Sequence, residues 1–202
     1  RDHMIVQSKC GIREGLYDLS KDYILQSVDG ILKRLKTEYL DILLLHRPDA
    51  LMEPEEIAVA LDTLHAAGKV RHFGVSNANA MQIALLSKYI QYPIIVNQVQ
   101  FSVAHTGLID AGLNVNMKNP QSVDHDGDVL TWSRMHDVTM QCWSPLSYGY
   151  FEGTFLNNDK FSELNTVLAQ IGEEKNASKA AVAIAWILRH PAGIEPMIGF
   201  MK

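Results

Sequence analysis

The chain of 202 residues is long enough for one substantial hydrophobic core, and we expect a single domain. With 47% hydrophobic and 20% charged residues, its composition is that of an ordinary globular protein, and its net charge of −5 provides no basic field for nucleic acid. No apolar run reaches the roughly 18 residues that a membrane-spanning helix needs, so neither nucleic acid nor a membrane is an expected partner.

Short apolar runs alternate with longer helical patterns in the first half of the chain. A strand is predicted over residues 4–9, and Ser20 is the expected N-cap of the helix that follows. That helix has an apolar face made of Ile24, Val28, Ile31, Leu32 and Leu35. The run Leu40–Leu45 is apolar on both faces, which is typical of a buried parallel strand. A second helix begins with Pro54 in its first turn and ends at Gly68.

The same alternation continues in the second half. The predicted strands cover residues 72–75, 94–98, 138–143 and 196–199. The predicted helices cover residues 81–90, 129–135 and 178–189, the last of them capped by Ser178. Residues 101–128 carry little helical or strand pattern and are expected to form a long functional loop. Six strands joined by helices predict a parallel sheet, either a doubly wound sheet or a (β/α)8 barrel.

The only two cysteines, Cys10 and Cys142, both follow or lie in apolar runs. Because cysteine is among the most buried residue types, we expect two reduced, buried thiols in a cytoplasmic protein.

Polar residues end five of the predicted strands. They are Lys9, His46, Ser76 with Asn77, Asn97 with Gln98, and Trp143 with Ser144. In a barrel enzyme the chemistry is located at the carboxyl ends of the strands. A series of five such endings therefore favours one shared site over solvated surface.

The sequence around these endings resembles the aldo-keto reductase family, most closely its oxidoreductase branch found widely in bacteria. The segments are Gln-Ser-Lys at 7–9, Leu-Leu-Leu-His-Arg-Pro at 43–48, Gly-Lys-Val-Arg-His-Phe-Gly-Val-Ser-Asn at 68–77, Asn-Gln-Val-Gln at 97–100 and Trp-Ser-Pro-Leu at 143–146. The resemblance implies an α/β fold, the (β/α)8 TIM barrel, with about strands 3 to 8 present. It further implies one partial barrel domain over residues 1–202 that moves a hydride between NADP(H) and a small-molecule carbonyl.

The resemblance also implies roles for individual residues. Lys9 matches the family's catalytic lysine, which stabilises the phenolate of a proton-donating tyrosine. His46 matches the histidine that orients and polarises the substrate carbonyl. Ser76, Asn77 and Gln98 match the residues that hold the nicotinamide carboxamide, and Trp143 takes the place of the ring that stacks on the nicotinamide. The residues matching the pyrophosphate path and the segment that holds the adenosine 2′-phosphate are Ser144, Leu146, Gly199, Phe200 and Lys202.

Two family features do not occur in this sequence. The family's catalytic Asp and Tyr precede the position of Lys9, and the tyrosines present here lie elsewhere. We therefore expect the working protein to be longer than these residues. The alternatives are a regulatory homologue that binds nucleotide without turnover and an inactive fragment. The physiological substrate, the preference for NADPH over NADH and the oligomeric state are left open.

No metal site is predicted. The acidic run at 124–128 resembles part of a calcium loop, but the bidentate glutamate expected near the end of such a loop is missing.

Overall fold

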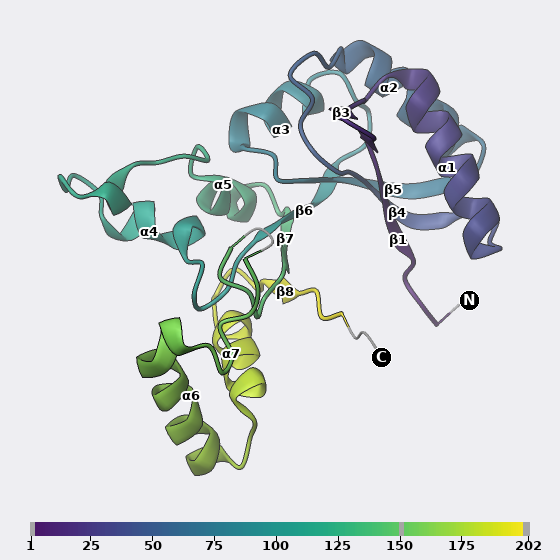
Figure 1. Cartoon of the computed structure of the whole chain (residues 1–202). Coiled ribbons are helices and arrows are strands. Elements are labelled where there is room, and N and C mark those ends of the chain that lie inside the picture. Colours follow the sequence, from purple (N-terminus) through teal and green to yellow (C-terminus); the bar gives the residue numbers. More distant parts are fainter. Residues whose placement is uncertain (1–2, 150–151, 200–202) are drawn as a thin grey trace. The chain divides into compact units, whose positions relative to one another are not determined.

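The computed structural model describes residues 3–149 and 152–199 (Figure 1). The chain divides into two compact units. The first unit is residues 1–97 with 136–138, and the second is residues 98–135 with 139–202.

The first unit contains the strands with which the main sheet begins. In sheet order they are β1 (Gln7–Cys10), β4 (Leu40–Leu45), β5 (Val70–Ser76) and the start of β6 (Ile94–Gln100). β1 pairs with β4 and β4 with β5 in parallel register, with Lys9 opposite Leu44 and Leu44 opposite Gly74. A short antiparallel hairpin, β2 (Ile12–Arg13) with β3 (Leu16–Tyr17), follows β1.

Three helices complete this unit: α1 (Lys21–Leu35), α2 (Pro54–Ala66) and α3 (Ala80–Ser87). The Ser20 side chain accepts a hydrogen bond from the Tyr23 backbone N–H and so caps α1, as predicted. Four of the five predicted apolar positions of α1 are buried, whereas Leu35 at the last turn is half exposed. Helical periodicity therefore locates the packed face, but not the point at which the helix leaves the core.

The second unit contains the end of β6, then β7 (Thr139–Trp143) and β8 (Glu195–Pro196), adjacent in that order. β7 and β8 are parallel, with Gln141 opposite Glu195. The helices of this unit are α4 (Gly107–Leu113), η1 (Pro120–Ser122), α5 (Val129–Met135), η2 (Asp159–Phe161), α6 (Ser162–Lys175) and α7 (Lys179–Leu188).

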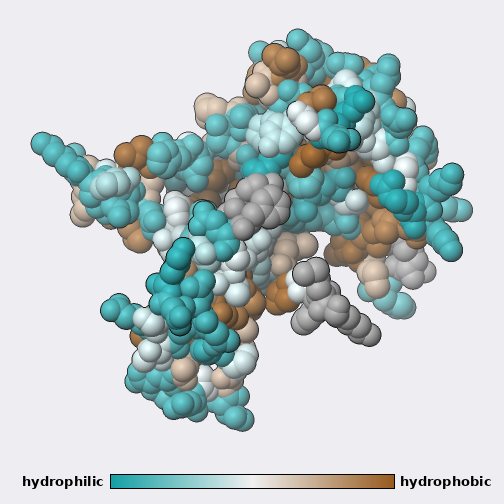
Figure 2. All heavy atoms as spheres, in the orientation of Figure 1, coloured by the Kyte–Doolittle hydropathy of each residue, from teal (hydrophilic) through white to brown (hydrophobic). Residues whose placement is uncertain are grey.

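Helices α6 and α7 pack around a small apolar cluster of Phe155, Leu168 and Ala183. Of α6, only Leu168 and Gly172 are buried, and the helix surface visible in Figure 2 is largely hydrophilic. Ser178 caps α7 by accepting from the Ala181 backbone N–H, as predicted.

The prediction that residues 101–128 form one long loop was wrong in part, because α4 and η1 lie within this segment. Helix α4 has no buried residue, so no apolar stripe marks it in the sequence. The hairpin and α6 were also missed. The six predicted strands are all present in the main sheet of the described residues, and all but Leu40–Leu45 have shifted ends.

Cys10 and Cys142 are both free and buried, as predicted. Burial raises the pKa of the Cys10 thiol to about 12 and that of Cys142 to about 11. Within residues 3–149 and 152–199, no helix is both long and apolar enough to cross a membrane.

Asp41 joins the start of β1 to β5, and we expect its loss to destabilise the first unit. Its carboxylate accepts from the Val6 backbone N–H at 2.8 Å and from Arg71 at 3.0 Å. Asp41→Ala should lower the free energy of unfolding by about 1–2 kcal/mol, since a partly buried N–H loses a charged acceptor. Chemical denaturation measures the change.

The matched control is Asp29→Ala, which removes the ion pair that Asp29 makes with Lys69 at 2.5 Å. Both side chains of that pair are exposed, so its loss should cost less than about 1 kcal/mol. Equal losses in the two variants would show that Asp41 does not hold the strands together.

Candidate active site

Lys9 and His46 lie at the carboxyl ends of neighbouring parallel strands. Lys9 is the penultimate residue of β1. The backbone N–H of His46 donates to the Cys10 carbonyl at 2.8 Å, which continues the β1–β4 ladder by one residue. Both side chains are half-buried and line one groove of about 330 Å³. Parallel pairing therefore brings together the two residues to which the resemblance assigned chemistry.

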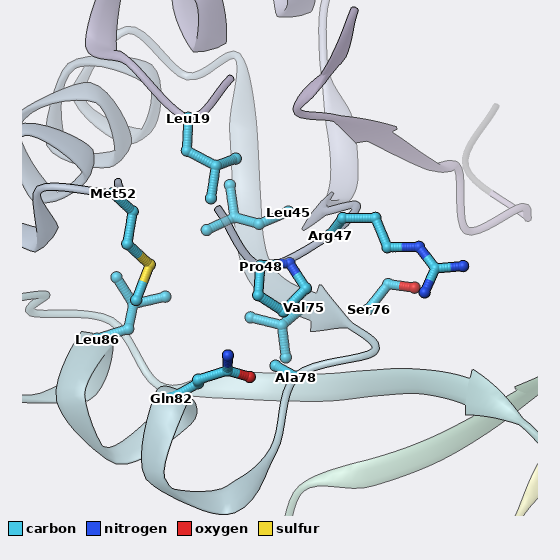
Figure 3. Close-up of a pocket in the computed structure, with 10 residues that line it drawn as sticks. All are labelled: Leu19, Leu45, Arg47, Pro48, Met52, Val75, Ser76, Ala78, Gln82 and Leu86. Carbon is cyan, nitrogen blue, oxygen red and sulfur yellow. The ribbon is translucent and has the colours of Figure 1, made fainter. Parts of the chain in front are cut away.

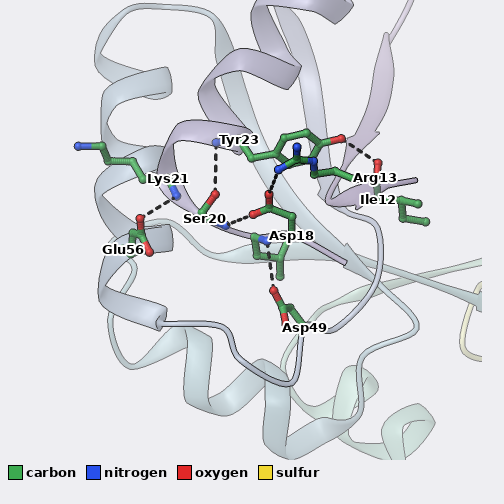
Figure 4. A network of polar contacts seen from close by, with 9 residues as sticks. Ile12, Arg13, Asp18, Ser20, Lys21, Tyr23, Asp49 and Glu56 are labelled. Carbon is green, nitrogen blue, oxygen red and sulfur yellow. Dashed lines mark hydrogen bonds and ion pairs between the residues drawn. The ribbon is translucent and has the colours of Figure 1, made fainter. Parts of the chain in front are cut away.

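The segment after β1 is held in place by a network around Asp18 (Figure 4). The Asp18 carboxylate accepts from Arg13 at 2.9 Å and from the Ser20 backbone N–H at 2.9 Å. The Tyr23 hydroxyl donates to the Ile12 carbonyl at 2.8 Å, and the Leu19 backbone N–H donates to Asp49 at 3.3 Å. These contacts hold the β2–β3 hairpin against the start of α1. They therefore limit the conformations of the segment that follows Lys9.

The environment of the pair lowers the pKa of both side chains. Burial lowers the pKa of Lys9 below its ordinary value. Burial, followed by the positive charges of Lys9 and Arg47, lowers the pKa of His46. At neutral pH the imidazole is therefore uncharged and can donate its remaining N–H to a carbonyl oxygen.

The lowered pKa of His46 predicts a loss of stability in acid. Below the unfolded histidine value of about 6.5, the unfolded chain binds a proton that the folded state resists. The contribution is therefore complete above that pH and is lost as the pH falls toward the folded pKa. His46→Gln should flatten the dependence of the unfolding free energy on pH in this range, as measured by urea denaturation from pH 7.5 to 5.

His190 is the control for this measurement. Its pKa is also lowered, by burial and then by Arg134, so His190→Gln should remove a separate part of the same slope. An unchanged slope in His46→Gln would contradict the assignment.

Ser76 is the last residue of β5, and Asn77 begins the turn that follows it. Ser76 is 1% exposed, and Asn77 has a left-handed backbone with φ 56°. The Asn77 side-chain amide donates to the Ser76 hydroxyl at 2.8 Å. Two residues later Asn79 caps α3 in a reciprocal capping box with Gln82. The turn is therefore fixed on both sides, and its left-handed residue is held by its surroundings.

Asn97 supports this turn and was not assigned a role from the sequence. Its side-chain amide donates to the Ala78 carbonyl at 2.9 Å, and the residue is fully buried. Among the described residues, no donor reaches its Oδ1. The sequence carries one signal for this role, which is a polar residue inside an otherwise apolar strand. Asn97 was predicted only as part of a strand ending.

A small apolar pocket of about 20 Å³ lies behind the ends of β4 and β5 (Figure 3). Aliphatic side chains form most of its wall, among them Leu19, Leu45, Val75 and Leu86. Such a lining suits packing of the strand ends against the helices better than binding of a polar ligand.

The predicted cofactor residues of the second unit lie inside β6, which continues two residues past the predicted strand end at Gln98, and at or just after the end of β7. Gln98 is 1% exposed, and Trp143 is half-buried. Ser144, the first residue after β7, has a left-handed backbone with φ 50°. Leu146 is half-buried against the cluster around Phe155. In each unit, a strand that carries predicted cofactor contacts is followed directly by a non-glycine residue with a left-handed backbone. These residues are Asn77 after β5 and Ser144 after β7.

Gly199 is exposed, beyond the end of β8. Phe200 and Lys202, which were predicted to reach the 2′-phosphate, lie outside the described residues.

In the part of the chain that the structure describes, no three His, Cys, Asp or Glu side chains are grouped to hold a metal ion. The carboxylate of Asp124 instead accepts from the backbone N–H groups of Asp126 and Gly127, at 3.0 and 2.9 Å.

The fold is a parallel α/β sheet that carries polar residues at consecutive strand ends, the arrangement of a barrel enzyme. The model of the aldo/keto reductase family matches residues 1–202. The chain therefore belongs to the aldo-keto reductase family, and the predicted (β/α)8 fold class is confirmed.

Several relatives carry names of oxidoreductases. The chain is 38% identical over 211 residues to the oxidoreductase YdhF of Escherichia coli, and the match covers all of this chain and 64% of the relative. It is 34% identical over 209 residues to a 6-dehydroglucose reductase of Agrobacterium fabrum, with 98% of this chain and 63% of the relative covered. The chain thus spans less than two thirds of the length of these relatives.

Among solved structures, a thermostable aldo-keto reductase in complex with the inhibitor epalrestat matches with a TM-score of 0.72 at 25% identity. The match covers 99% of this chain and 63% of that one.

Proposed function

We propose that the protein carrying this chain reduces aldehyde or ketone carbonyls to alcohols, with NADPH as the hydride donor. The observation that carries the proposal is the pairing of Lys9 and His46 at adjacent strand ends, in one groove and with both pKa values lowered. Membership of the family supports it, as does the name of a relative that reduces a dehydroglucose.

In this proposal each residue of the pair has one task. His46, uncharged at neutral pH, donates an N–H to the carbonyl oxygen and so fixes the face that is attacked. Lys9 presents its ammonium to the phenol that the family carries ahead of this position, which favours the phenolate and makes the phenol a better acid. When bound, the reduced nicotinamide supplies the hydride to the carbonyl carbon, while the oxygen takes the proton.

The side chains that we propose to hold the nicotinamide have the chemistry that its carboxamide needs. A carboxamide needs both hydrogen-bond donors and acceptors, and Ser76 at the end of β5 and Gln98 within β6 are polar side chains that are almost fully buried. Asn77 belongs to the same set. Trp143 offers a ring for stacking, and Ser144 and Leu146 follow it where the pyrophosphate would run. The preference for NADPH over NADH rests on Lys202 and belongs to the proposal.

The organisation of the chain is also part of the proposal. Residues 1–202 would belong to one barrel domain.

The test is titration with NADPH and with NADH, followed by quenching of tryptophan fluorescence. We expect saturable quenching, tighter for NADPH, that is largely lost in Trp143→Ala and retained in the control Trp132→Phe, whose indole lies on α5. Quenching that is absent, or that is equal in Trp143→Ala and the parent, would overturn the proposal. Turnover of simple aldehydes by the protein that carries this chain then separates a reductase from a homologue that only binds nucleotide.

A further inference from the structure

Three polar side chains form a continuous chain across β6, β7 and β8, all within the second unit. The Gln98 side-chain amide donates through Nε2 to Gln141 Oε1 at 3.0 Å. The Gln141 amide donates through its own Nε2 to the Glu195 carboxylate at 3.1 Å. Gln141 and Glu195 are directly opposite one another in the β7–β8 register.

The direction of this chain is set by chemistry. A carboxylate only accepts hydrogen bonds, so Gln141 must turn its NH₂ end toward Glu195. Its carbonyl end then faces Gln98, and an acceptor at that place requires the NH₂ end of Gln98. The two amides thus have one consistent orientation, which avoids the ambiguity that normally attaches to a glutamine side chain.

Burial makes the orientation costly to reverse. Gln98 is 1% exposed and Gln141 is 7% exposed. If either amide rotated by half a turn, two like ends would face each other inside the protein, which leaves buried polar atoms unpaired.

We propose that Glu195 is a positioning residue that sets, through Gln141, which end of the Gln98 amide is directed at the nicotinamide carboxamide. The proposal rests on the proposed function, in which Gln98 holds that carboxamide. With its NH₂ end turned to Gln141, Gln98 directs its carbonyl oxygen away from Gln141, as an acceptor for the carboxamide NH₂. None of the family motifs quoted from the sequence contains Gln141 or Glu195.

The decisive variant is Glu195→Lys, because an ammonium only donates hydrogen bonds. Gln141 would turn its carbonyl end to the lysine, its NH₂ end would face Gln98, and Gln98 would turn its own NH₂ end to the cofactor. Glu174→Lys on α6 is the matched control, since it changes the net charge equally at an exposed helical position. Gln141→Met is a second test variant. It removes the amide that links Gln98 to Glu195 and keeps the side-chain volume nearly constant.

The readout is the ratio of the dissociation constants of two cofactors, NADP⁺ and its 3-acetylpyridine analogue, in which a methyl group replaces the carboxamide NH₂. The parent and Glu174→Lys should bind NADP⁺ about tenfold more tightly than the analogue, the size of one mispaired buried hydrogen bond. In Glu195→Lys and Gln141→Met the ratio should approach one. A purely structural role would weaken both cofactors equally and leave the ratio unchanged, and that result would overturn the proposal.

A second measurement needs no cofactor, so it separates failure of this inference from failure of the proposed function. In ¹⁵N-labelled protein, the Gln98 side-chain NH₂ signals, assigned by their loss in Gln98→Leu, should exchange slowly with solvent in the parent and in Glu174→Lys. In Glu195→Lys they should shift and exchange faster. Unchanged signals would overturn the orientation chain even where the parent binds NADP⁺.

If the parent does not bind cofactor while these signals behave as expected, the result supports the hydrogen-bonded series from Glu195 through Gln141 to Gln98. It contradicts the proposed role of Gln98 in cofactor binding.

Discussion

Gly74→Ala is expected to destabilise the first unit by about 3 kcal/mol, near the upper end of the cost of overpacking a core. A Cβ at this position would lie 2.5 Å from Leu44 Cδ2 and 2.7 Å from the Val96 carbonyl oxygen. The carbonyl belongs to the backbone of β6, the strand next to β5, so it cannot move aside without disturbing the sheet. Thermal or urea denaturation measures the loss.

Gly107→Ala provides the matched control. A Cβ at Gly107 would meet no heavy atom within 4 Å, and the residue begins α4. Its free energy of unfolding should therefore change by less than about 0.5 kcal/mol. If the two alanine variants melt alike, the strands around Gly74 are less closely packed than these distances indicate.

The second large effect is expected at Lys9. In the protein that carries this chain, Lys9→Met should lower the turnover of an aldehyde substrate by about 10²–10⁴-fold, the usual contribution of a positioned group to proton transfer. Cofactor affinity should change little, because the predicted cofactor residues do not include Lys9. The measurement is kcat and KM for aldehyde and for NADPH.

The stability of the same variant distinguishes chemistry from folding. Burial lowers the pKa of Lys9, so the folded state gains nothing from its charge, and Lys9→Met should melt no lower than the parent. Lys33→Met, at an exposed position of α1, is the control and should retain full turnover. Turnover in Lys9→Met above a tenth of the parent value would exclude the role assigned to Lys9.

The local sequence by itself determined most of the elements of the sheet and their order along the chain. Ser20 and Ser178 were predicted as N-caps, and both side chains accept from a backbone N–H three residues ahead, an interaction that a short segment decides alone. Leu40–Leu45 was predicted with its observed bounds, because a run apolar on both faces suits only a buried strand. Helix α4 escaped prediction because it buries no residue and so leaves no apolar period to detect.

For the candidate site, the strand endings and the family resemblance singled out Lys9, His46, Ser76 and Gln98. The tertiary structure decided which partners these residues have. Strand pairing sets Lys9 beside His46, and the charge of Lys9 then helps to lower the histidine pKa.

The partners of Gln98 lie 43 residues away at Gln141 and, through it, a further 54 residues away at Glu195. No local sequence pattern indicates these contacts, because they form between strands that are far apart in the sequence.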